Sequence, residues 1–113
     1  MKIHFYQDVK GEPLDSPGSS GVKRRVVISE EDGAENFIMR VFEVEPGGYT
    51  PSHNHPWEHE AFIQKGSGII ISQGNEYPVK EGDAIFIPGG EDHQFKNAGQ
   101  DVLEFICVIP KIT

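Results

Sequence analysis

Turn-forming residues interrupt every apolar segment of this chain, and this punctuation limits what the chain can fold into. The turns contain Gly, Pro, Asn or Asp and lie at residues 45–48 (EPGG), 73–75 (QGN), 81–83 (EGD), 88–90 (PGG) and 97–99 (NAG), which is the chemistry that tight turns require. No window of helical length between them keeps a 3.6-residue apolar period. The pattern therefore predicts an all-β domain of short strands, built as a sandwich, jelly roll or small barrel.

The segments between these turns have the length and apolar character of strands. The predicted strands are residues 25–29, 37–44, 60–64, 68–72, 76–79, 84–87, 93–96 and 102–109. Residues 11–21 (GEPLDSPGSSG) are interpreted as a flexible loop after an apolar N-terminal arm at residues 2–9, which is expected to pack on the body or on a neighbouring subunit. With this arm and loop (residues 1–21) included, residues 1–113 are expected to form one domain, because the length suits one domain and hardly two.

The charge balance excludes nucleic acid as a partner. The chain has 18 acidic and 10 basic residues and a net charge of −8, so it would repel a polyanion on average. Its one basic cluster, residues 23–25 (KRR), is interpreted as a solvated strand face, with a contact to a partner subunit or an anionic ligand as the alternative.

Other features of the sequence indicate a cytoplasmic protein. No segment approaches the roughly 20 apolar residues that span a membrane, and the N-terminus has no apolar run behind a basic end. The single cysteine, Cys107, rules out an internal disulfide and suits a reducing compartment.

Histidines give the clearest functional signal. His53, His55 and His59 lie close together in sequence, and His93 begins a predicted strand after a Pro-Gly-Gly turn. The two histidines of a His-x-His pair on one strand point to the same face, because side chains alternate with a period of two. Since neutral imidazole is a strong ligand for first-row divalent metals, the spacing predicts a metal site. Its affinity should fall as the pH drops through about 6–7, where free imidazole takes up a proton.

Residues 47–97 resemble the two sequence motifs of the cupin family. Gly47, followed by five residues and then His53-x-His55, matches the start of the first motif, G-x5-H-x-H-x3–4-E-x6-G. The second motif, G-x5-P-x-G-x2-H-x3-N, is matched at every spacing by Gly82, Pro88, Gly90, His93 and Asn97. The resemblance implies a cupin jelly-roll β-barrel with the metal inside it.

The fourth ligand departs from the usual cupin pattern, in which it is a glutamate. Six residues separate His59 from Gly66, as the first motif requires, whereas only five separate Glu60 from it. The resemblance therefore implies the metal ligands His53, His55, His59 and His93, with Glu60 on the opposite face of its strand. The alternative is that Glu60 ligates and His59 lies at the rim.

The sequence is similar to the small four-histidine cupins of bacteria, whose members bind manganese and are dimeric. This similarity implies a homodimer with one divalent transition metal per chain, Mn or Fe first, although Ni, Cu, Zn and Co also suit imidazole ligands. Four neutral ligands leave the ion its full charge and two open positions on a six-coordinate ion. Two functions fit such a site: a metal-dependent, oxygenase-like oxidoreductase acting on a small organic molecule, or a non-catalytic module that binds a small molecule or senses metal.

Strand parity predicts which other residues line the site. Phe95 shares a strand face with His93. In the last strand, Glu104 is expected to face solvent, which would turn Phe105 and Cys107 into the pocket. Cys107 is interpreted either as an ordinary buried core residue or as an oxidisable thiol beside a redox metal.

Two further residues have competing interpretations. Arg40 lies in the apolar segment 37–44. An inward Arg40 would recruit a carboxylate substrate, while an outward one, the favoured interpretation, is plain surface. Trp57 either caps the mouth of the pocket or packs in a dimer interface.

Overall fold

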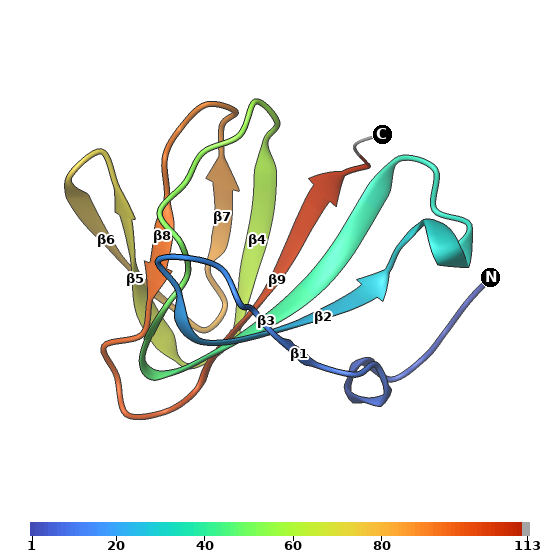
Figure 1. The fold of residues 1–113 in the computed structure, drawn as a ribbon, viewed down its shortest axis with the longest axis horizontal. Coiled ribbons are helices and arrows are strands. Elements are labelled where there is room, and N and C mark those ends of the chain that lie inside the picture. Colours follow the sequence, from blue (N-terminus) through green and yellow to red (C-terminus); the bar gives the residue numbers. More distant parts are fainter. Residues whose placement is uncertain (112–113) are drawn as a thin grey trace.

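The computed structural model describes residues 1–111, and this part of the chain is almost entirely β (Figure 1). Its strands are β1 (Glu12–Pro13), β2 (Ser20–Ile28), β3 (Phe37–Tyr49), β4 (His59–Lys65), β5 (Ser67–Ser72), β6 (Asn75–Lys80), β7 (Ala84–Ile87), β8 (Gln94–Lys96) and β9 (Leu103–Pro110). Two short 3-10 turns, η1 (Tyr6–Asp8) and η2 (Glu30–Asp32), precede and follow β2. Within residues 1–111 no helix is long and apolar enough to cross a bilayer. The all-β prediction is confirmed, and each predicted strand range overlaps a strand.

The turn predicted at residues 45–48 is wrong, because β3 continues through these residues to Tyr49. The register between β3 and β2 shifts across them, so the extra residues of β3 form a bulge. Gly47 has a positive φ of 82°, and a Cβ on Gly48 would lie 2.7 Å from the carbonyl oxygen of Ser20. The glycines therefore allow a bulge within a long strand and do not form a chain reversal.

The loop predicted at residues 11–21 is also wrong at both ends. β1 pairs Glu12 with Arg24 and Pro13 with Lys23, and β2 already begins at Ser20. This two-residue strand exists because β2 pairs with it, and its own two residues carry no strand pattern.

The strands form one curled sheet in the order β6-β5-β8-β3-β9-β4-β7, with β2 on β3 and β1 on β2. β3 makes the curl possible, because most of it pairs with β2 and β9 while its last residue, Tyr49, pairs with β8. Figure 1 shows the resulting half-barrel and the segment after β3, which crosses it to reach β4. The cupin-type barrel predicted from the two motifs is confirmed in this form.

Apolar side chains fill the inside of the curl. Val44 and Leu103 have no exposed surface, and full burial of such a side chain contributes roughly 1.5–3 kcal/mol. The Phe105 ring stacks on Phe42 and on Phe95, at centroid distances of 5.1 and 4.1 Å. These three rings belong both to the core and to the wall of the cavity described below.

Asn97, the last residue of the second motif, has a structural role. Its side-chain amide donates to the carbonyl oxygens of Val44 and Asp101, both at 2.8 Å, and its Oδ1 accepts from the Gly99 backbone N–H at 2.9 Å. Asn97 is 2% exposed and its hydrogen bonds are made, so it ties the turn between β8 and β9 to β3 at little desolvation cost.

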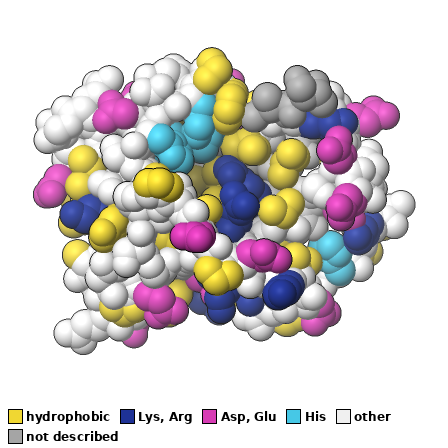
Figure 2. Space-filling model, in the orientation of Figure 1, with side chains coloured by type: hydrophobic (Ala, Val, Ile, Leu, Met, Phe, Trp, Pro, Cys, Tyr) yellow, Lys and Arg dark blue, Asp and Glu magenta, His cyan; other side chains and the backbone are white. Residues whose placement is uncertain are grey.

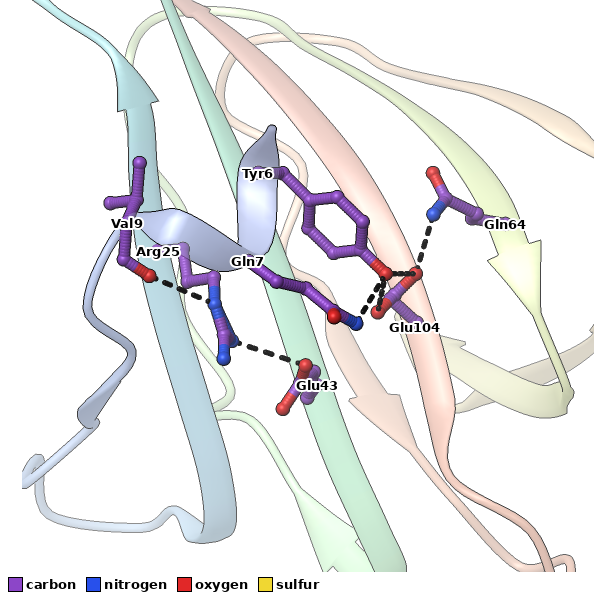
Figure 3. Close-up of polar contacts among 7 residues, drawn as sticks. All are labelled: Tyr6, Gln7, Val9, Arg25, Glu43, Gln64 and Glu104. Atoms are coloured by element: carbon purple, nitrogen blue, oxygen red, sulfur yellow. Dashed lines mark hydrogen bonds and ion pairs between the residues drawn. The ribbon is translucent and has the colours of Figure 1, made fainter. Parts of the chain in front are cut away.

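The N-terminal arm packs on the outer face of the sheet and buries a charge there (Figure 3). Glu104, predicted to face solvent, is only 3% exposed, so that prediction is wrong. The Tyr6 hydroxyl donates to the Glu104 carboxylate at 3.2–3.3 Å, and Gln64 Nε2 donates at 2.6 Å. Beside them, Arg25 donates to the Val9 carbonyl and to Glu43, both at 3.1 Å. The predicted packing of the arm on its own body is therefore observed.

Candidate metal centre

The candidate histidines come from separate segments that meet inside the curl. His53 and His55 lie between β3 and β4, His59 begins β4, and His93 immediately precedes β8. An isolated antiparallel bridge joins His53 to His93 through backbone hydrogen bonds of 3.2 and 3.0 Å. This bridge brings the first motif beside the second, a contact that sequence spacing alone does not give.

Three of these histidines already offer ligand atoms to a common point. One ring nitrogen each of His53, His55 and His93 lies within 4.8 Å of the others. His59 is outside this group of three, but its ring centroid lies 4.3 Å from that of His55 and 5.0 Å from that of His93. The structure therefore clusters three ligand atoms and places the fourth ring against them.

The free nitrogen of His59 supports a place for a metal ion. His59 is 6% exposed, and its Nε2 is buried without a hydrogen-bond partner within residues 1–111. A buried polar atom that lacks a partner costs about 1–3 kcal/mol, so it calls for an explanation, and a bound ion is one. The donor set, imidazole nitrogens only, suits Fe, Ni, Cu and Zn. The residues present thus fit a divalent transition metal.

Desolvation favours the neutral ring in His53, His55 and His59. Desolvation, followed by the charges of the neighbouring imidazoles and of Arg40, lowers the pKa of His55 from 6.5 to about 4 and that of His59 to about 3. The pKa of His53 is lowered as well, by burial first and then by His93 and Arg40. The ring nitrogens therefore keep their lone pairs at pH 7. The pH window of about 6–7 predicted from free imidazole is too high for these rings.

Neighbouring groups orient the rings. His93 Nδ1 lies 3.1 Å from the Glu91 carbonyl oxygen, which can only accept, so this nitrogen carries the proton and Nε2 keeps the lone pair. His59 Nδ1 lies 3.6 Å from Cys107 Sγ. The Trp57 ring stacks on His55 at 4.5 Å and 8°. Trp57 therefore packs against the histidine cluster within its own chain.

A cavity of about 240 Å³ opens beside the histidines. It is lined by Leu14, Ser16, Arg24, Arg40, Phe42, Thr50, Pro51, His53, His55, His93, Phe95, Phe105 and Cys107. The predicted pocket residues Phe95, Phe105 and Cys107 are among these. Figure 2 shows histidine, Lys or Arg and hydrophobic side chains meeting around a hollow in the face that it presents.

Arg40 points into this cavity, so its favoured assignment to the surface is wrong. Arg40 and Cys107 are directly paired across β3 and β9 and therefore share a face. Arg40 Nη2 donates to Cys107 Sγ at 3.2 Å, and its guanidinium lies 5.0 Å from the centroid of the Phe42 ring. The inward orientation follows from the β3–β9 register, which the sequence does not show.

Glu60, the competitor of His59, lies on the outer side of the sheet. It is exposed and borders a groove there with Phe62 and Phe86. It does not line the cavity beside the histidines.

Known proteins resemble this chain in sequence and fold. Residues 40–109 match the family described as the cupin domain. An oxalate-binding protein from Thermotoga maritima is 37% identical over 96 residues, which are 81% of this chain and 78% of that protein. The solved structure of the polyketide cyclase RemF from Streptomyces resistomycificus is 40% identical, with a TM-score of 0.92 over 97% of this chain and 79% of that one. A predicted oxalate decarboxylase from Thermotoga maritima is 25% identical, with a TM-score of 0.87 over 98% of this chain and 100% of that one.

Proposed function

This chain belongs to the cupin family, and we propose that its histidine cluster holds one divalent transition metal and uses it to act on a small organic molecule. The proposed ligands are His53, His55, His59 and His93. The observation that carries the proposal is the cluster itself: three ligand atoms within 4.8 Å of one another, beside a fourth imidazole whose buried Nε2 has no partner. Manganese or iron is the proposed ion.

Bound there, such an ion supplies Lewis acidity and one-electron redox chemistry. The chain contributes orientation and exclusion of water. The Glu91 carbonyl holds His93 in one tautomer, and the Trp57 ring restrains His55. Stacked phenylalanines form an apolar wall that strengthens polar contacts in the cavity.

The reaction class follows from what lines the cavity. Among residues 1–111, no Asp or Glu side chain lines it, so no carboxylate is placed to move a proton on a bound molecule. Isomerases and epimerases need a side-chain base, which is often His, and the histidines that line this cavity are the proposed metal ligands. The site therefore favours an oxygenase-like oxidoreductase over a proton-transfer enzyme.

The cavity also limits the size of the molecule. Its volume of about 240 Å³ is below the range of about 300–1,000 Å³ that is typical for drug-sized ligands. Of the molecules in the names of the similar proteins, oxalate suits this volume better than a polyketide does. The oxalate-binding relative supports a second candidate function, which is binding of a small molecule without turnover.

Metal and turnover can be tested separately. The purified chain is loaded with Mn(II) or Fe(II), its metal content is measured by mass spectrometry, and oxygen consumption is followed with small carboxylic acids and small phenols. We expect one ion per chain and oxygen uptake that depends on both metal and organic molecule. Binding without oxygen uptake or product would favour the second function. A chain that takes up no metal would refute the metal proposal itself.

We also propose that the chain forms a homodimer through the outer groove between β4, β7 and β9. Phe62 and Phe86 are 46% and 60% exposed there, although they are large and apolar. Pairing of two such faces would remove this surface from water and cover the edge strand β7.

The cytoplasmic location remains a prediction, which the buried free thiol of Cys107 supports.

A further inference from the structure

The cavity beside the histidines is positive in a negatively charged protein. The chain carries 18 acidic side chains, yet within the described residues none of them lines this cavity, whereas Arg24 and Arg40 do. In the β2–β3 register, Arg24 lies opposite Phe42 and is thus a diagonal neighbour of Arg40 on the inner face. Two guanidinium groups and a divalent ion held by neutral imidazoles would give the cavity a strong positive potential.

The guanidinium of Arg40 lacks the partners that such a group normally has. Its Nε is buried and without a hydrogen-bond partner within residues 1–111, and its Nη2 donates only to sulfur, a weak acceptor. No described carboxylate forms an ion pair with it. Arg40 as a whole is partly exposed, but its Nε is buried, and a buried polar group without a partner is costly. A guanidinium has the fork geometry that matches a carboxylate with two parallel hydrogen bonds.

Arg40 is also next to the proposed metal ligands. The Cys107 sulfur lies 3.2 Å from Arg40 Nη2 and 3.6 Å from His59 Nδ1, so a single atom separates the guanidinium from the imidazole. His53, His55 and His93, three of the proposed ligands, line the same cavity of about 240 Å³ as Arg40, so a small molecule in it can reach both the guanidinium and the proposed metal site.

We propose that Arg40 is the specificity-determining residue of this cavity and binds a carboxylate of a small organic acid, with Arg24 adding longer-range attraction. The inference rests on the proposed function, because the other end of the acid would lie at the metal. The competing explanation is structural: Arg40 packs over Phe42 and holds Cys107 in place. That role predicts a loss of stability on substitution but no preference for charged ligands.

Three probes of nearly equal shape separate these explanations: oxalate, oxamate and oxamide, which carry two, one and no negative charges. Calorimetric titration of the Mn-loaded protein should show affinity that falls in this order. Arg40→Gln should weaken oxalate binding about tenfold to a hundredfold and leave oxamide binding unchanged, with the metal content still one per chain. Arg25→Gln is the matched control, because Arg25 pairs with Glu43 on the outer face; it should bind oxalate as the wild type does.

Equal oxalate affinity in the wild type and Arg40→Gln, or oxamide binding as tight as oxalate, would overturn the inference. If Arg40→Gln does not fold, Arg40→Lys replaces it: a point charge without the fork should weaken oxalate binding several-fold, and unchanged affinity would count against the inference. If the chain takes up no metal, the proposed function fails by itself. The inference is then decided on the metal-free protein, by whether Arg40→Gln abolishes the chemical-shift changes that oxalate causes.

Discussion

Acidification should destabilise the metal-free protein, because the fold holds His59 neutral. The pKa of His59 is about 3 in the folded protein, against an ordinary value of 6.5 for an exposed histidine. Between these two values the unfolded chain binds a proton that the folded chain does not. The free energy of unfolding is therefore highest above pH 6.5 and falls as the pH is lowered toward 3.

The size of the effect follows from the shift. Each pH unit within the window lowers the free energy of unfolding by about 1.4 kcal/mol per group. Between about pH 7 and pH 5, the unfolded chain gains its extra proton only below pH 6.5. Over these roughly 1.5 pH units, His59 alone lowers the free energy of unfolding by about 2 kcal/mol. For a domain of this length, that corresponds to a fall in Tm of about 8 °C. His55 has a smaller shift and is half-exposed, so solvent reduces its contribution.

Thermal unfolding of chelator-treated protein, followed by circular dichroism at pH 7 and pH 5, measures this change. The His59→Gln variant is the control, because glutamine fills similar space and does not titrate. Its free energy of unfolding should fall by about 2 kcal/mol less than that of the wild type over the same interval. Comparing pH-dependent changes removes any constant effect of the substitution. Equal losses in the two proteins would refute the reasoning.

Four more predictions follow from the site and its surroundings. His59→Ala should weaken metal binding by at least the roughly 10–100-fold that loss of an outer hydrogen-bond partner costs, while Glu60→Ala should leave the ion bound; metal analysis showing the reverse would make the site a three-histidine, one-glutamate centre. Metal content measured against pH should persist at about pH 6 and fall toward about pH 4, because burial lowers the pKa of the ligand imidazoles. Cys107 should react with thiol reagents only slowly until the protein is unfolded, because burial raises the pKa of its thiol; rapid stoichiometric labelling of the folded protein would contradict this. Light scattering should give the mass of two chains for the wild type and of one chain for Phe62→Glu or Phe86→Glu, whereas dimeric variants would place the interface elsewhere.

The strands could be predicted from sequence because their limits are local. A Gly, Pro or Asn at a turn acts through the conformations that it allows or forbids, and those do not depend on the rest of the chain. The errors occurred where pairing or close contact with another strand decides the local structure. β1 exists only because β2 pairs with it, and the bulge at Gly47 and Gly48 exists only because β2 passes close to them.

The histidine candidates could be proposed because few residue types can bind a transition metal and because the family motifs supply the spacing of the ligands. The contact between His53 and His93 could not be predicted, because it is a backbone bridge between segments far apart in sequence. Arg40 was assigned to the surface for the same kind of reason. Its side is set by the pairing of β3 with β9, which brings it opposite Cys107.

Arg40 and Glu104 were both predicted to face solvent, and both predictions are wrong. The two residues differ in whether their hydrogen-bond partners are present. Alternation assigns charged side chains to solvent only where one face of a strand is fully exposed. Here the inner face lines the cavity and the outer face is covered by the N-terminal arm. Glu104 receives hydrogen bonds from Tyr6 and Gln64, so its burial is complete without any other molecule. Arg40 has only the Cys107 sulfur and an unpartnered Nε. Since buried polar groups need hydrogen bonds to be tolerated, the completed hydrogen bonds of Glu104 hold the fold together, and the missing partner of Arg40 Nε supports the proposed binding of a carboxylate there.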